Sequence, residues 1–165
     1  MSRETDLWAV ARAVHAFLEP VWPEWHRAWG GQQPVMPSQW TCGRSSLFLQ
    51  KVLNEDLAIP AQWVSGVPQE GSEMKSIGFF TGSRWEGHAW VEVQQGWIID
   101  ITADQFGADA IIVTRDGDAR YCKGESDTAL PVFVANRQRA VAELWPHWQA
   151  SPLRTGLMAA TGNRV

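Results

Sequence analysis

The chain is poor in cysteine, and this scarcity limits the chemistry that it can support. Among 165 residues there are two cysteines, Cys42 and Cys122, which are too few for a framework of disulfide bonds. The opening residues 1–6 are polar and mixed in charge, and no apolar segment typical of a secretory signal follows them. We therefore expect a reduced, cytoplasmic setting.

Long apolar runs and an excess of basic charge are also missing. No apolar run approaches the roughly 18 residues that a membrane span requires. The formal net charge is −4 and Lys and Arg form no cluster, which argues against a nucleic-acid partner. The Cys and His residues lack the paired spacing of metal ligands. We expect no membrane, nucleic acid, metal or cofactor to take part in the function.

What remains is the composition of an ordinary globular protein, with 45% hydrophobic and 19% charged residues and 11 tryptophans. Residues 1–165 are long enough for a single domain with its own core. The periodicity predicts an α+β fold with helices over 7–18, from about 42 to 54 and over about 135–145, and with strands over 61–67, 77–81, 88–93, 97–102, 110–114 and 119–123. The segment 20–37 should be loop with one helical turn over 24–29, and the tail 151–165 shows no pattern and is expected to be mobile.

The stretch 87–106 contains the strongest local pattern, two alternating strands joined by the loop 94–96. If the apolar sets face each other, the predicted pairs are Val93 with Trp97, Val91 with Ile99 and Ala89 with Ile101. This register places His88 opposite Thr102, with Asp100 as its diagonal neighbour on the same face. A histidine beside an aspartate forms two thirds of a catalytic triad.

Cys42 is the candidate for the third member. It comes at the start of a predicted helix, where the positive end of the helix dipole favours a thiolate. The alternative is a small buried hydrophobic residue, which is also the role we expect for Cys122. His15 and His26 are expected to be surface or boundary histidines.

Two segments together resemble the transglutaminase-like branch of the papain-like cysteine enzymes. The first contains Cys42 before a leucine-rich run, then Ile59-Pro60-Ala61 and Val64-Ser65-Gly66-Val67. The second contains His88-Ala-Trp-Val-Glu-Val93, Gly96-Trp97 and Asp100-Ile-Thr102. The resemblance covers about residues 38–106. It implies a papain-like core over about 38–125, in which N-terminal helices include the nucleophile helix and this helix packs on an antiparallel β-sheet.

The resemblance also implies roles for individual residues. Cys42 would be the nucleophile, His88 the base and Asp100 the residue that orients His88. Ile101 follows the aspartate where family members often have proline, and Asp104 is a rival for the orienting role. Backbone N–H groups at the start of the helix are candidate oxyanion donors. Gln39, Trp40 and Trp90 are candidates for further oxyanion or substrate contacts.

The implied function is a thiol-dependent hydrolase or acyltransferase that acts on a peptide or protein amide through an acyl-enzyme. A protease, an amidase, and a glutamine deamidase or transglutaminase all use this chemistry. An N-acetyltransferase-like role is less favoured, because no separate segment for a nucleotide carrier is visible. The alternative from another class is a non-catalytic peptide-binding or assembly module on the same fold.

Overall fold

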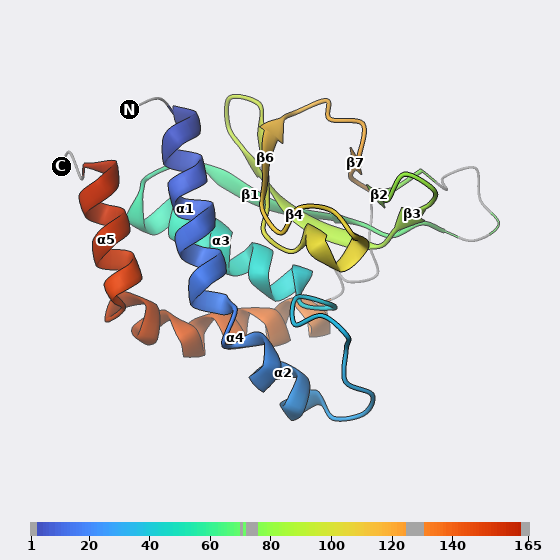
Figure 1. The fold of residues 1–165 in the computed structure, drawn as a ribbon, viewed down its shortest axis with the longest axis horizontal. Helices are drawn as coiled ribbons and strands as arrows, with labels where there is room; N and C mark the ends of the chain where they lie inside the picture. Colours follow the sequence, from blue (N-terminus) through green and yellow to red (C-terminus); the bar gives the residue numbers. More distant parts are fainter. Residues whose placement is uncertain (1–2, 70, 72–75, 125–130, 163–165) are drawn as a thin grey trace.

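The computed structural model describes residues 3–69, 71, 76–124 and 131–162 of the chain. These residues form helices and antiparallel strands, which confirms the predicted α+β class (Figure 1). The helices are α1 (Arg3–Leu18), α2 (Trp22–Trp29), α3 (Cys42–Asp56), α4 (Pro131–Gln149) and α5 (Pro152–Thr161), with a 3-10 turn, η1 (Ala103–Phe106). Within the described residues, no helix has both the length and the apolar character needed to cross a bilayer.

The strands form two antiparallel sheets. The larger sheet has the order β1-β4-β5-β6 and contains β1 (Ala61–Gly66), β4 (His88–Val93), β5 (Trp97–Asp100) and β6 (Ile112–Arg115). The smaller sheet has the order β3-β2-β7 and contains β3 (Trp85–Glu86), β2 (Gly78–Phe80) and β7 (Tyr121–Cys122). The helices gather on one side of the larger sheet, and the smaller sheet continues from its end (Figure 1).

The register predicted for the β4–β5 hairpin is confirmed. Val93 pairs with Trp97 and Val91 pairs with Ile99, as the facing apolar sets require. The loop has three residues, and Gln95 and Gly96 both have a φ of +78°. The ladder ends before the predicted pair of Ala89 with Ile101, because the chain leaves β5 after Asp100.

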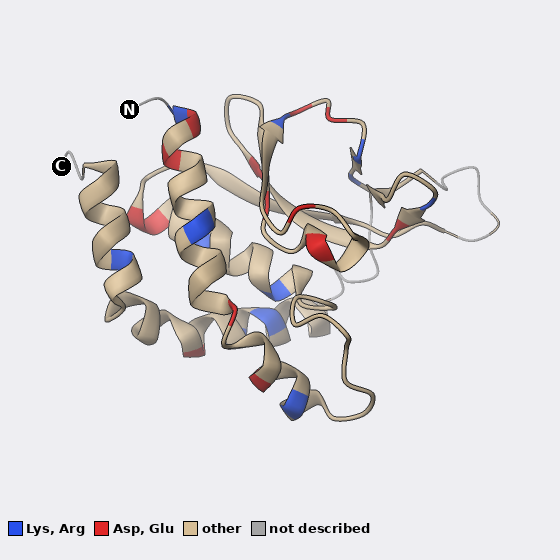
Figure 2. Cartoon of the chain, in the orientation of Figure 1, with Lys and Arg blue, Asp and Glu red and all other residues tan. Residues whose placement is uncertain are grey.

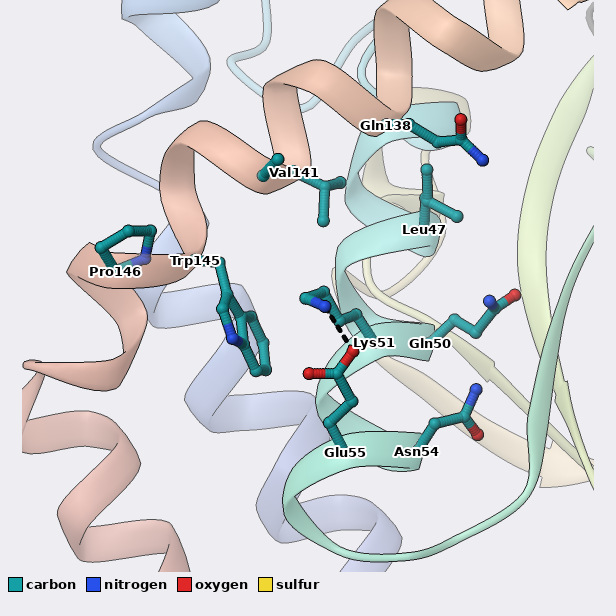
Figure 3. A pocket seen from close by; sticks show the side chains of 10 residues that line it. Leu47, Gln50, Lys51, Asn54, Glu55, Gln138, Val141, Trp145 and Pro146 are labelled. Atoms are coloured by element: carbon teal, nitrogen blue, oxygen red, sulfur yellow. Dashed lines mark hydrogen bonds and ion pairs between the residues drawn. The ribbon is translucent and has the colours of Figure 1, made fainter.

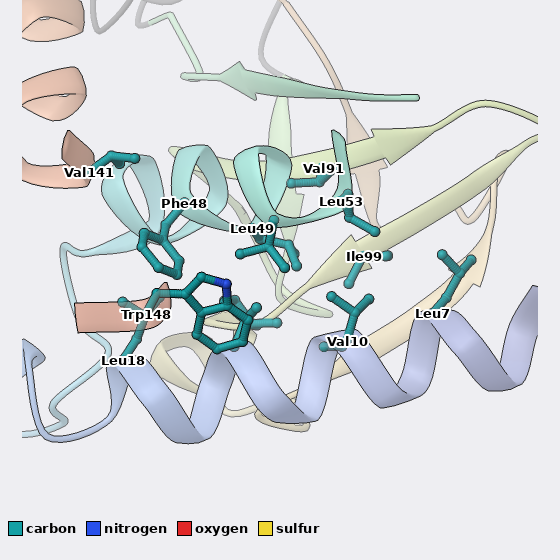
Figure 4. Close-up of a cluster of buried hydrophobic side chains, with 14 of the residues drawn as sticks. Leu7, Val10, Leu18, Phe48, Leu49, Leu53, Val91, Ile99, Val141 and Trp148 are labelled. Carbon is teal, nitrogen blue, oxygen red and sulfur yellow. The ribbon is translucent and has the colours of Figure 1, made fainter. Parts of the chain in front are cut away.

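The main core lies between the larger sheet, α1 and α3 (Figure 4). The apolar stripe predicted on the first helix is buried, and it consists of Leu7, Val10, Ala11, Val14 and Leu18. The helix α3 packs against β4 and β1, which agrees with the predicted packing of this helix on an antiparallel sheet, and it buries Phe48, Leu49, Val52 and Leu53. This packing fixes the position of the first turn of α3 relative to the first residue of β4.

Two glycines allow the smaller sheet to approach the larger one. A Cβ atom on Gly66 would lie 2.4 Å from Ile77 Cγ2 and 2.9 Å from the Cys122 carbonyl oxygen. A Cβ atom on Gly78 would lie 2.1 Å from the Glu86 carbonyl oxygen, and Gly78 has a φ of +102°, which favours glycine. The close approach brings the Tyr121 side chain of β7 to Trp90 of β4 and Asp100 of β5.

The C-terminal region differs from the prediction. Pro146 does not end α4, which continues to Gln149, because Trp148 is fully buried and its indole N–H donates to Asp56 Oδ2 at 2.8 Å. This packing outweighs the backbone hydrogen bond that proline removes from the helix. The tail predicted to be mobile contains α5, in which Arg154 donates to both carboxylate oxygens of Asp56. Residues 163–165 lie outside the described part.

Three smaller predictions are also corrected. The strand predicted over 119–123 is shorter, because β7 covers only Tyr121–Cys122, where it pairs with β2 and packs Tyr121 against Phe79. The helical turn predicted over 24–29 is part of the longer α2. His26 is buried rather than at the surface, and its Nε2 lies 2.8 Å from the Pro37 carbonyl oxygen. Of the predicted polar loop 68–75, residues 70 and 72–75 lie outside the described part.

Candidate active site

Cys42 is the first residue of α3, as predicted, and its side chain is half-buried. The preceding residue, Thr41, makes no side-chain cap on the helix, because its hydroxyl donates to the Ser38 carbonyl oxygen at 2.6 Å. The N–H groups in the first turn of an α-helix have no partner within the helix and carry the positive end of its dipole. Cys42 therefore lies where an anion is stabilised.

His88 and Asp100 lie side by side beneath this helix end. His88 is the first residue of β4 and Asp100 the last residue of β5. The His88 Nε2 atom lies 2.7 Å from Asp100 Oδ2, and the two residues are 3% and 1% exposed. The contact predicted from the register of the hairpin is confirmed. The imidazole is surrounded by the rings of Phe79, Trp90 and Phe106.

Cys42 and His88 are coupled electrostatically. Burial acts to raise the pKa of the Cys42 thiol, but the His88 side chain and a backbone hydrogen bond with Ala89 lower that pKa below its ordinary value. Burial acts to lower the pKa of His88, but the Asp100 carboxylate and the Cys42 side chain raise it to about 10. These opposite shifts favour a thiolate beside an imidazolium.

The direction of the imidazole follows from its two nitrogens. Nε2 is committed to Asp100, which leaves Nδ1 for the thiol. Nδ1 is buried and makes no hydrogen bond of standard geometry within the described residues, so its contact with Cys42 does not meet the distance and angle of a hydrogen bond. Catalytic hydrogen bonds are often long before substrate binds.

Asp100 is held by donors on both of its oxygens. The Thr102 backbone N–H donates to Oδ1 at 2.9 Å, with the Thr102 hydroxyl at 3.4 Å from the same atom. The Tyr121 hydroxyl donates to Oδ2 at 3.0 Å, which is the oxygen that binds His88. Burial and the Asp100 carboxylate raise the pKa of Tyr121, so the phenol remains a donor.

Tyr121 is a site residue that the sequence analysis missed. It is the single tyrosine of the chain and lies 21 residues beyond Asp100. Only the pairing of β7 with β2 brings it to the carboxylate. No local pattern in the sequence predicts that pairing of strands, and so none predicts the contact of Tyr121 with Asp100.

Asp104, the rival orienting residue, points elsewhere. It lies in η1, and its Oδ1 accepts a hydrogen bond from Ser38 Oγ at 2.5 Å. The neighbouring Gln105 accepts from the Trp40 backbone N–H at 3.3 Å and donates to the Thr102 carbonyl oxygen at 2.8 Å. The η1 turn therefore holds the loop that precedes Cys42, while Asp100 alone of the two carboxylates binds His88.

The three residues predicted to make oxyanion or substrate contacts occupy two different places. Gln39 and Trp40 line a cleft of about 640 Å³, together with residues that include Thr81, Arg84, Gly87 and Phe106. Trp40 is 57% exposed and has a φ of +65°, an uncommon conformation for a bulky residue. Trp90 is only 1% exposed, and its ring centre lies 6.2 Å from that of His88, so it contacts His88 rather than the cleft.

A second hollow lies between α3 and α4, away from this chemistry (Figure 3). Its volume is about 460 Å³, and Leu47, Val141 and Trp145 form its apolar wall. Two of its polar residues are already used in the fold: Gln50 accepts from the Trp63 N–H, and Asn54 binds both backbone groups of Ala61. This hollow contains none of the three candidate catalytic residues.

Other reactive groups do not form a competing centre. In the part of the chain that the structure describes, no group of three or more His, Cys, Asp or Glu side chains is arranged to hold a metal ion. Cys122 is a free, half-buried thiol in β7. The geometry therefore singles out Cys42 as the candidate nucleophile.

No protein-family model, curated protein or solved structure matches the chain. A function must therefore be argued from the site itself.

Proposed function

We propose that the protein is a thiol-dependent amide hydrolase or acyltransferase, with Cys42 as nucleophile, His88 as base and Asp100 as the residue that orients His88. The observation that carries the proposal is the buried His88–Asp100 pair next to a cysteine at an uncapped helix N-terminus. A histidine with a purely structural role needs only the hydrogen bond to its carboxylate. The His88 side chain also lowers the pKa of the Cys42 thiol. Perturbed pKa values in a cleft are typical of catalytic groups.

The residues support a complete acyl-transfer cycle. His88 accepts the Cys42 proton at Nδ1, and the thiolate attacks the carbonyl carbon of an amide. The N–H groups in the first turn of α3 stabilise the oxyanion. The imidazolium then protonates the leaving amine, and the Cys42 thioester is resolved by water or by a second amine. Water gives hydrolysis or deamidation, whereas an amine gives transfer.

The arrangement also favours a papain-like, transglutaminase-like core over about residues 38–125. In that arrangement the nucleophile begins a helix that packs on an antiparallel sheet, the base begins one strand and the orienting residue lies on the next. Cys42 in α3, His88 in β4 and Asp100 in β5 have these positions. The likeness in order and in packing supports the assignment of roles.

The test is the pH dependence of Cys42 alkylation by iodoacetamide, measured by intact mass in a Cys122→Ser background. We expect the rate to stay high well below the ordinary thiol pKa of about 8.5 and to lose this feature in His88→Ala. A rate that follows an ordinary thiol would contradict the proposal. That outcome, with Cys42→Ala still able to bind peptides, would favour the non-catalytic binding module.

A second measurement concerns turnover. We expect Cys42→Ala to abolish hydrolysis in a screen of amides and peptides while its circular dichroism and melting temperature stay close to those of the wild type. Activity that survives in Cys42→Ala would exclude the cysteine as nucleophile, whatever its reactivity toward iodoacetamide.

A further inference from the structure

An arginine from the C-terminal helix lies against the first turn of the nucleophile helix. Arg137, in α4, is half-buried, and a Cβ atom on Gly43 would lie 2.6 Å from its Nε and 2.8 Å from its Cζ. Gly43 directly follows Cys42, so the absence of a side chain there lets the guanidinium reach the helix backbone. The guanidinium also lies over the Trp63 ring, with Cζ 5.4 Å from its centre. No local pattern in the sequence predicts this contact, because it joins residues 94 positions apart.

A second arginine, Arg44, lies near enough to Arg137 for the two charges to interact. Arg44 packs its guanidinium over Trp29 and Trp25, at 4.6 and 5.1 Å from their ring centres, and donates to Asn136 Oδ1 at 2.9 Å. Figure 2 shows the basic segments of α3 and α4 where these helices meet. Burial and the nearby Arg137 lower the pKa of Arg44, while Glu143 acts in the opposite direction. Two like charges are therefore held close together.

The electrostatics connect Arg137 to the reacting centre. Burial lowers the pKa of Arg137, while the charge of Cys42 acts to raise it. Two guanidinium groups beside a helix N-terminus create a local positive potential in a chain whose net charge is −4. Such a potential stabilises an anion in addition to the thiolate.

We infer that Arg137, with support from Arg44, binds a carboxylate of the substrate next to the amide that Cys42 attacks. A guanidinium offers a planar pair of N–H donors that match a carboxylate, and stacking on an aromatic ring holds the plane of that group. The inference rests on the proposed function and names its substrate class. The substrate is a peptide or acylated amino acid with a carboxylate within about one residue of the scissile amide.

The first test compares two alkylating agents of similar size and different charge. The rate of Cys42 modification by iodoacetate is divided by the rate with iodoacetamide, in the Cys122→Ser background and at a pH where the thiolate is fully formed. We expect this ratio to fall about fivefold in Arg137→Gln, the factor for one unit charge at about 4 Å in a water-like medium. High salt should reduce the difference.

Two further variants make the test specific. Arg139→Gln removes a charge from an exposed position of the same helix, so we expect it to leave the ratio unchanged. Gly43→Ala keeps Arg137 but places a methyl group where the guanidinium lies, so it should also lower the ratio. An unchanged ratio in folded Arg137→Gln would overturn the inference. The same holds if Arg137→Gln shifts only the iodoacetamide pH profile, because the arginine would then act on the thiol alone.

The carboxylate could come from a chain terminus or from an acidic side chain, and a protection assay separates these sources. N-acetylglutamine carries an α-carboxylate, its isomer N-acetylglutamate α-amide carries a side-chain carboxylate, and the corresponding diamide carries neither. We expect one of the two acids to protect Cys42 from iodoacetamide better than the diamide does. The margin should disappear in Arg137→Gln and persist in Arg139→Gln. Equal protection by the diamide, or no protection by either acid, would count against the inference.

These readouts separate the inference from the proposed function. If Cys42 is not an activated nucleophile, the pH profile with iodoacetamide is that of an ordinary thiol, whatever the ratio of the two agents. If only the carboxylate site is wrong, the pH profile remains activated and the ratio does not depend on Arg137.

Discussion

Replacement of Asp100 by asparagine should disable the site through the tautomer of His88. The Asp100 carboxylate accepts four hydrogen bonds, two on each oxygen. The side-chain NH2 group of asparagine cannot take the position of Oδ1, because the Thr102 backbone N–H is a fixed donor to that position. It must therefore replace Oδ2, where it faces His88 Nε2 and the Tyr121 hydroxyl. The hydroxyl can rotate and accept, but Nε2 can accept only if the imidazole is neutral and carries its proton on Nδ1.

This change removes the base that Cys42 needs. With the proton on Nδ1, the imidazole can neither take the thiol proton nor stabilise a thiolate by its charge. Loss of the orienting aspartate in a triad lowers kcat by about 10⁴-fold, for this tautomeric reason. We expect a loss of similar order in amide turnover. For alkylation near pH 6.5 the expected loss is about 100-fold, because a thiol with a pKa of about 8.5 is then about 1% ionised.

The assay is the rate of Cys42 alkylation by iodoacetamide in the Cys122→Ser background, with Asp104→Asn as the matched control. An asparagine at position 104 can still accept the hydrogen bond from Ser38, so we expect its rate to stay within a few-fold of the unsubstituted protein. Melting temperatures of both variants show whether the fold is retained. Equal losses in the two variants at equal stability, or an undiminished rate in Asp100→Asn, would refute the assignment of Asp100.

Three other outcomes are expected. Tyr121→Phe keeps the ring but removes a hydrogen bond to a buried carboxylate, so chemical denaturation should show about 1.5 to 3 kcal/mol less stability. The loss of turnover should be much smaller than in Asp100→Asn, and an unchanged stability would contradict this role of Tyr121. The active thiolate–imidazolium pair should persist as pH rises and be lost when His88 deprotonates, so turnover should fall near pH 10. A fall in turnover near pH 6.5 instead would show that the pKa of His88 is not raised. Asp56→Ala leaves the buried Trp148 N–H without its acceptor and should lower stability by about 2 to 3 kcal/mol. Asp56→Asn keeps an acceptor and should lower stability less, and equal losses in the two variants would show that packing, rather than the hydrogen bonds, dominates.

The part of the site that the sequence predicts is local. The β4–β5 hairpin has a strict alternation, a short loop and a register that only one pairing of apolar residues satisfies. That register alone places His88 beside Asp100. The helix start at Cys42 is also predicted by local spacing, whereas its packing on an antiparallel sheet is implied by the resemblance.

The contacts that the sequence does not predict join residues far apart along the chain. Tyr121 reaches Asp100 only because Gly66 and Gly78 allow the two sheets to approach. Arg137 reaches the first turn of α3 only because α4 packs along that helix and Gly43 leaves space. The sequence predicts that the last long helix ends at about residue 145, next to Pro146. Instead, α4 continues to Gln149, because the burial of Trp148 outweighs the backbone hydrogen bond that Pro146 cannot make. In each case tertiary packing overrides the local signal.

The hydrogen bond between His88 Nε2 and Asp100 leaves one imidazole nitrogen for proton transfer in the proposed reaction. The imidazole packs among Phe79, Trp90 and Phe106, and its Nε2 is hydrogen-bonded to Asp100, so in the proposed reaction Nδ1 is the nitrogen that exchanges protons with a substrate. In the proposed reaction the same nitrogen takes the thiol proton and delivers it to the leaving amine. In the proposed reaction the leaving amine therefore binds next to Nδ1, and the cleft lined by Trp40 and Gly87 is a candidate for its position because Gly87 directly precedes His88. Because η1 binds Ser38 and Trp40, one set of hydrogen bonds holds both the wall of this cleft and the loop that leads into Cys42.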